Sequence, residues 1–250
     1  MGQIVLRYQI SIFGSFDEIK PSAENIKFFI DKFSDKGFIP NQFTEVSLEI
    51  KSELNKGTET SNVETSRLRL SDSDKKWDIR FASDRIDFLF VNSNIGQIKM
   101  IEKDIFLSEV YEFINRINEK YQIKSKRVGL LTQYLYDGLD VNKVSSSFQN
   151  NIDFFNQKPI IDWNLKTATR HIIEEIKEVA NFSTEIRKIQ RPMKINNGTS
   201  LFDGLLLNID INTLAENESY RFTIESIKSF INEFSTVETT ILNETNAKLQ

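Results

Sequence analysis

The stretch GLLLNIDINTL, residues 204–214, determines which fold is predicted, because two rows of side chains alternate along it. A period of two is the pattern of a β-strand that buries one row and exposes the other. It therefore predicts a half-buried strand with Asp210 on its polar, solvent-facing side. The apolar row comprises Leu205, Leu207, Ile209 and Ile211, and the other row comprises Leu206, Asn208, Asp210 and Asn212.

Further strands and amphipathic helices are predicted along the rest of the chain. Alternating runs of β-branched and aromatic residues predict strands. Apolar stripes of helical period predict helices, with Ser22 and Ser108 as N-terminal caps. In the strand around Trp77, Asp78 and Arg80 face away from the apolar row. The polar run 56–66 has no period and predicts a hairpin tip. The predicted strands are 4–13, 43–54, 67–71, 76–83, 85–93, 128–137, 163–173, 179–190 and 205–214, and the predicted helices are 21–37, 106–122 and 221–242.

This order of elements predicts an α+β fold in which antiparallel sheets carry amphipathic helices on one face. Each half of the chain shows several antiparallel strands followed by one amphipathic helix, so the two halves are predicted to be similar. The irregular, polar stretch 141–160 is the expected boundary. It separates an N-terminal half, residues 1–140, from a C-terminal half, residues 141–250, unless both belong to one continuous domain.

Composition and motifs disfavour several classes of function. The net charge of −4 gives the whole molecule no attraction for phosphate backbones. The absence of cysteine excludes disulfides, thiolate metal sites and cysteine nucleophiles. His171 is the single histidine, which disfavours histidine-based zinc sites and a Ser-His-Asp triad. Neither glycine pattern for phosphate binding, G-x-x-x-x-G-K or G-x-G-x-x-G, occurs, so no cofactor is expected.

The chain is expected to be cytoplasmic and to have no membrane partner. Its first residues, MGQIVLRYQISIFG, lack the charged region, apolar run and cleavage site of a signal peptide. No run of the sequence approaches the ~18 apolar residues that a membrane-spanning helix needs.

Two strand motifs resemble a sporadically distributed bacterial α+β family. They are RVGLLTQYLYDGL, residues 127–139, and GLLLNIDINTL before the last predicted helix. The family carries a VGLRY-like strand in mid-chain and an LLLDIDV-like strand before its C-terminal helix. This chain departs from the family at Leu131, where Arg is favoured, and at Asn208, where Asp is common. The resemblance implies an α+β fold and brings no catalytic residues. The family is distributed sporadically, as is common for phage-defence genes.

A metal-dependent nuclease or phosphodiesterase that uses Asp203 and Asp210 is one alternative function. Two-metal catalysis needs several carboxylates that converge, often with a lysine nearby. The acidic-x-Lys sequence Glu175-Ile176-Lys177 precedes both aspartates and is predicted to be a turn. The sequence therefore favours a solvated strand over a metal site at these positions.

A nucleic-acid-binding module is a second alternative, based on local positive charge. The first basic cluster has Tyr121 and Tyr134 nearby, so charge and stacking together would suit a nucleic acid. Basic residues at the ends of elements are also ordinary solvated side chains, which is the favoured interpretation of both clusters. The first cluster is Lys120, Lys124, Lys126 and Arg127, and the second is Arg187, Lys188, Arg191 and Lys194.

Aromatic residues within a stretch rich in Asn and Gln support the function that the sequence favours. They are predicted either to fill a seam between the two halves or to anchor a partner protein. The favoured function is a non-enzymatic component of a bacterial multi-protein system, of the phage-defence kind, that binds another protein chain or itself. The candidate partner-binding residues are Phe148, Phe154, Phe155 and Trp163.

Overall fold

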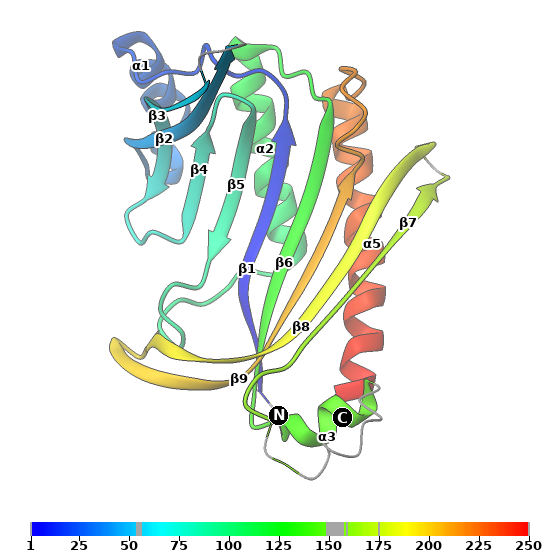
Figure 1. Ribbon diagram of the computed structural model, residues 1–250. Coiled ribbons are helices and arrows are strands. Elements are labelled where there is room, and N and C mark those ends of the chain that lie inside the picture. Colours follow the sequence, from blue (N-terminus) through cyan, green and yellow to red (C-terminus); the bar gives the residue numbers. More distant parts are fainter. Residues whose placement is uncertain (1, 54–56, 149–157, 159, 175, 250) are drawn as a thin grey trace.

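The computed structural model of the 250-residue chain describes residues 2–53, 57–148, 158, 160–174 and 176–249. Strands and helices account for most of this range (Figure 1). The strands are β1 (Gly2–Phe13), β2 (Phe38–Glu53), β3 (Gly57–Asp72), β4 (Trp77–Phe81), β5 (Arg85–Val91), β6 (Arg127–Asp137), β7 (Asn164–Ile173), β8 (Glu178–Ile195) and β9 (Gly198–Thr213). The helices are α1 (Ala23–Phe33), the short 3-10 helix η1 (Ser34–Lys36), α2 (Lys103–Tyr121), α3 (Val141–Ser147) and α5 (Ile224–Leu249).

The strands form one nine-stranded antiparallel sheet in the order β2-β3-β4-β5-β1-β6-β9-β8-β7. This confirms the predicted α+β class with antiparallel strands. At the centre β1 pairs with β6, and Ile10 lies opposite Leu130. The sheet continues without a break across residue 140, because β6 pairs with β9 and Leu130 also lies opposite Ile211.

Helices α1, α2 and α5 lie together on one face of the sheet, behind it in Figure 1. The main core fills the space between these helices and the sheet. Phe113 of α2 and Phe230 of α5 are fully buried there, as the helical period predicts. Burial of large aromatic side chains is the main favourable contribution of such a core. None of the described helices is long and apolar enough to cross a membrane.

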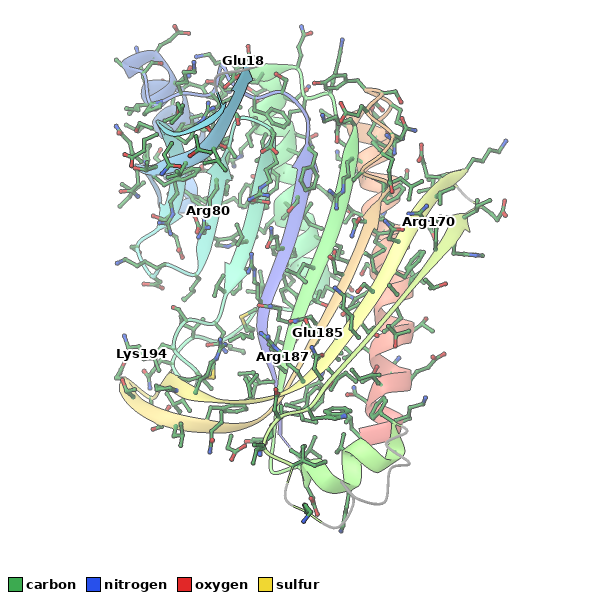
Figure 2. The ribbon with its side chains drawn as sticks, viewed as in Figure 1. Glu18, Arg80, Arg170, Glu185, Arg187 and Lys194 are labelled. Atoms are coloured by element: carbon green, nitrogen blue, oxygen red, sulfur yellow. The ribbon has the colours of Figure 1, made fainter. Side chains whose placement is uncertain are left out.

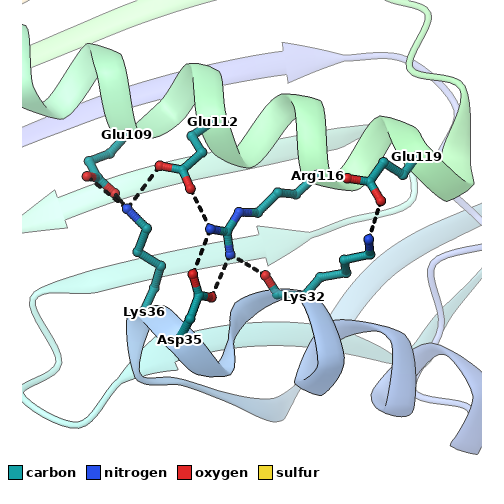
Figure 3. A network of polar contacts seen from close by, with 7 residues as sticks. All are labelled: Lys32, Asp35, Lys36, Glu109, Glu112, Arg116 and Glu119. Atoms are coloured by element: carbon teal, nitrogen blue, oxygen red, sulfur yellow. Dashed lines mark hydrogen bonds and ion pairs between the residues drawn. The ribbon is translucent and has the colours of Figure 1, made fainter.

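Surface ion pairs also join α1 and η1 to α2 (Figure 3). Arg116 holds the carboxylate of Asp35 with both terminal nitrogens, at 2.6 and 2.7 Å. Lys36 contacts Glu109 and Glu112, each at 2.9 Å. The Arg116 guanidinium lowers the pKa of Asp35. Exposed ion pairs contribute little to stability, so they orient helices that apolar packing already holds.

Several local predictions are confirmed. The backbone N–H of Asn25 donates to the Ser22 hydroxyl at 3.2 Å, so Ser22 caps α1. The turn between β8 and β9 lies at Asn196 and Asn197, whose φ values are 48° and 66°. Two central residues with positive φ suit a tight hairpin turn between twisted strands, which explains why the sequence Asn-Asn-Gly occurs there.

Other local predictions are wrong. Most of the run 56–66 is not a hairpin tip, because β3 begins at Gly57 and its backbone pairs with β2 along its whole length. Threonine and valine in this run favour extended backbone, and a two-stranded ribbon needs no apolar period. Helix α2 begins at Lys103, and Ser108 is an exposed residue within it. Part of the stretch predicted to be irregular, 141–160, forms α3.

A buried carboxylate connects α5, α2 and the central strand β6. Glu238 of α5 is fully buried. One of its oxygens accepts hydrogen bonds from the hydroxyls of Thr132 and Tyr134 at 2.8 and 2.7 Å. The other accepts from the Lys103 ammonium at 2.6 Å. Burial, reinforced by this carboxylate, raises the pKa of Tyr134 far above its ordinary value, so its phenol remains a donor at neutral pH.

A second, smaller core lies on the opposite face of the sheet, where the end of the β8–β9 hairpin bends across it (Figure 1). The hairpin is held by a parallel bridge between Ile95 and Ile195. The Asn94 amide also donates to Asn197 Oδ1 at 2.6 Å. This core comprises Leu6, Ile95, Leu135, Ile189, Phe202 and Leu206.

We expect Glu238→Ala to lower the free energy of unfolding by about 3–5 kcal/mol, because it leaves the partly buried Lys103 ammonium without its counter-charge and the buried Thr132 and Tyr134 hydroxyls without their acceptor. The matched control is Glu233→Ala on the same helix, where the side chain is partly exposed and has no ion pair among the described residues. We expect it to change stability by less than ~0.5 kcal/mol. Urea unfolding measures both, and equal losses would contradict the structural role of Glu238.

Candidate binding face

The face of the sheet opposite helices α1, α2 and α5 carries a charged and polar surface, which we call the open face (Figure 2). Alternation along each strand places these side chains opposite the apolar row that packs on the helices. Cations outnumber carboxylates on this face although the chain has a net charge of −4. The cations are Arg7, Arg69, Arg80, Arg85, Arg127, Lys166, Arg170 and Arg187, and the carboxylates are Asp78, Asp87, Glu185 and Asp210.

Two buried carboxylates organise the part of the open face on β3, β4, β5 and β1. Asp78 is 6% exposed and accepts hydrogen bonds from Arg69 at 2.6 Å and Arg80 at 2.8 Å. Asp87 is 5% exposed and accepts from Ser11 at 2.6 Å and Arg85 at 2.9 Å. Charge-assisted bonds of this kind fix the planes of the guanidinium groups before any partner arrives.

Amide side chains form two further groups of hydrogen bonds on β6, β9 and β8. Arg127 donates to Asn212 at 2.9 Å, and the Asn212 amide donates to Asp210 at 3.1 Å. In a parallel row, Asn208 accepts a hydrogen bond from Gln133 and donates one to Glu185 at 3.0 Å. Figure 2 shows Glu185 near the middle of β8 on this face. The open face therefore carries several separate groups of hydrogen-bonded side chains, and most of its charged residues have a partner on the face itself.

Some arginine donors on the open face have no partner. The Nε atoms of Arg7, Arg127 and Arg187 are buried and make no hydrogen bond with the described residues. Arg187 also takes part in no ion pair within the described part of the chain. Burial lowers the pKa of Arg7, and the nearby Asp87 carboxylate counteracts this effect. Buried donors without partners are costly, so each of these N–H groups is suited to donate to an added acceptor.

Asp210 lies on the solvent-facing side of β9, as the alternation of the sequence predicts. Its side chain is exposed and hydrogen-bonds to Asn212, as expected of the polar row of a half-buried strand. Asp203 lies an odd number of residues away on β9, hence on the other side of the strand, where Gln190 donates to it at 3.3 Å. The described residues contain no group of three or more His, Asp or Glu residues that could hold a metal ion. The two aspartates of the nuclease alternative therefore do not converge.

The first basic cluster is dispersed by the fold. Lys120 contacts Glu24 at 2.8 Å on the helix side of the molecule. Lys126 lies 3.6 Å from Glu218, and Lys124 is exposed. Only Arg127 belongs to the open face, where its guanidinium lies 4.5 Å from the centroid of the Phe13 ring.

The second basic cluster divides in a similar way. Arg187 lies on the open face. Lys188 donates to the carbonyl of Ile160 at 2.9 Å on the other side of β8. Arg191 and Lys194 lie at the bent end of the β8–β9 hairpin, and Lys194 is labelled there in Figure 2.

Two of the four candidate partner-binding aromatics can be placed. Phe148 and Trp163 contact each other, with ring centroids 6.1 Å apart, and both are half-buried against the main core. Phe148 also lines a cavity of about 450 Å³ between β7, β8 and α5. Phe154 and Phe155 lie outside the described residues.

Comparison of the chain with models of known protein families, with curated proteins and with solved structures finds no match. Most of the open face is not predicted by the individual strand patterns of the sequence. The pattern around Trp77 predicts that Asp78 and Arg80 face away from an apolar row. The same alternation occurs in RLRL, residues 67–70, and in RIDF, residues 85–88. Arginine at alternate positions of several strands is the signal that points to such a face.

We expect two isosteric substitutions on the open face to have different effects. Asp87→Asn replaces an acceptor of three hydrogen bonds with a group whose NH₂ faces donors, so we expect a loss of roughly 1–3 kcal/mol in the free energy of unfolding. Asp210→Asn changes an exposed side chain and should change it by less than ~0.5 kcal/mol. Urea unfolding of both variants tests this, and a large loss from Asp210→Asn would mean that Asp210 belongs to an essential network.

Proposed function

We propose that the protein is a non-enzymatic binding module that presents the open face of its sheet to another protein chain. The observation that carries this proposal is the ordered array of arginines on a face that no described helix covers. Arginine is enriched in protein interfaces because its planar guanidinium combines several donors with a large contact area. Side chains that are already hydrogen-bonded lose less conformational freedom on binding.

The carboxylates within the array favour a protein partner over a nucleic acid. Asp78, Asp87 and Asp210 alternate with the arginines across the face, and a phosphate backbone would come close to these negative charges. The net charge of −4 adds no long-range attraction for nucleic acid. A protein surface, in contrast, can place carboxylates opposite the arginines and amides opposite the aspartates.

The partner is inferred to be a different, acidic chain rather than a second copy. Two copies that met through their open faces would bring the same excess of positive charge together, which disfavours association. An acidic partner would instead place acceptors near the free Nε atoms of Arg127 and Arg187. The sporadically distributed family that the sequence resembles suggests a bacterial multi-protein system, of the phage-defence kind, as the setting.

The test is co-purification of the tagged chain from its native host, with the same experiment on an open-face variant. We expect the chain to retain one acidic protein, and Arg127→Ala/Arg187→Ala to reduce its recovery at least tenfold, because the variant lacks two guanidinium groups of the open face. The matched control is Lys20→Ala/Lys27→Ala, which removes two charges from exposed positions beside and within α1 and should leave recovery unchanged.

A thermal melt of each variant separates lost binding from lost folding. Recovery of no protein partner, or equal recovery by the open-face variant when it is folded, would contradict the proposal. Nuclease-sensitive recovery of nucleic acid, with a steep dependence on salt, would contradict it in favour of the nucleic-acid alternative.

A further inference from the structure

A cleft lies where the end of the β8–β9 hairpin approaches β4 and β5 across the open face. The hairpin is fixed there by the Ile95–Ile195 bridge and by the Ile95 backbone N–H, which donates to the Lys194 carbonyl at 3.0 Å. The small second core lies beside it. The cleft has a volume of about 440 Å³, which is within the range of small-molecule sites.

Four cations from three strands line this cleft. Arg7 and Arg80 come from the sheet, and Arg191 and Lys194 come from the hairpin. Figure 2 shows Arg80 on the sheet and Lys194 at the end of the β8–β9 hairpin. One wall is apolar and includes Leu89. The opposing cations repel one another across the cleft, so an anion between them would stabilise the arrangement.

No carboxylate lines the cleft in the described part of the chain. The nearest acidic residues are already engaged. Asp78 binds Arg69 and Arg80, one through each oxygen. Arg191 and Lys194 are exposed and form no ion pair with any described residue. The positive charge of the cleft is therefore only partly neutralised by the protein.

Two residues that line the cleft each have a buried polar atom without a hydrogen-bond partner among the described residues. These atoms are Nε of Arg7, a donor, and Oδ1 of Asn92, an acceptor. Asn92 is 6% exposed, and its amide nitrogen donates to the Val5 carbonyl at 3.3 Å, which leaves Oδ1 free. A ligand that satisfies both atoms must supply an acceptor to Arg7 and a donor to Asn92.

We propose that this cleft, between Arg7 and Arg80 of the sheet and Arg191 and Lys194 of the hairpin, binds a small molecule that carries a diphosphate group on a ring-shaped or apolar body. The phosphate oxygens accept hydrogen bonds from the guanidinium groups, which match phosphate geometry. The body lies against the apolar wall, and one of its N–H or O–H groups donates to Asn92. A nucleoside diphosphate has these features. The bound anion links the hairpin to the sheet.

Isothermal titration of the purified chain tests the proposal, with inorganic pyrophosphate and adenosine 5′-diphosphate as probes. We expect both to bind saturably, and adenosine 5′-diphosphate to bind at least tenfold more tightly because it also uses the apolar wall. Arg191→Ala/Lys194→Ala should weaken both at least tenfold. These exposed residues have no partner to lose, so the variant should keep the unliganded melting temperature.

The matched control is Lys166→Ala/Arg170→Ala, which removes two cations from the open face at the distant edge strand β7. We expect its affinity for both probes to equal that of the unmodified chain. Absence of saturable pyrophosphate binding, or equal binding by the hairpin variant, would overturn the site. Equal affinity for the two probes would overturn the role of the apolar wall.

Discussion

The buried carboxylate of Glu238 is the interaction on which the arrangement of this fold depends most. It joins α5 to the hydroxyls of Thr132 and Tyr134 on the central strand β6 and to Lys103 at the start of α2. A buried charge requires these partners, so it fixes both helices on the same side of the sheet. The opposite face is then left without a helix, and its residues must be stable in contact with water.

The open face meets this requirement with hydrogen bonds instead of apolar packing. Asp78 and Asp87 are almost fully buried, yet each is surrounded by donors on neighbouring strands. The guanidinium groups of Arg69, Arg80 and Arg85 bind these carboxylates, and the arginine side chains remain partly exposed. Where the β8–β9 hairpin bends across the face, a small apolar core replaces the array, and the cationic cleft lies at the border between the two. The surface proposed to bind a partner is therefore the same surface whose hydrogen bonds satisfy the buried carboxylates on this side of the sheet.

Local patterns in the sequence predicted the parts of the fold that depend on local physics. The alternation in 205–211 and the apolar stripe that includes Phe230 correspond to β9 and α5, and Ser22 caps its helix. The strand order was not predictable, because it depends on pairings between distant segments. The cleft was not predictable either, because Arg7 and Lys194 come close together only where the β8–β9 hairpin crosses the sheet. The start of α2 was missed because Lys103 is held by a residue far away in sequence.

The central claim is that the open face, and not the helix side, contacts the protein partner. The most direct measurement is modification of arginine by phenylglyoxal, read residue by residue by mass spectrometry in the free chain and in the purified complex. The account predicts that the modification of Arg127 and Arg187 falls strongly in the complex, whereas that of Arg116, on the helix side, is unchanged. Protection of Arg116 with continued modification of Arg127 and Arg187 would contradict it.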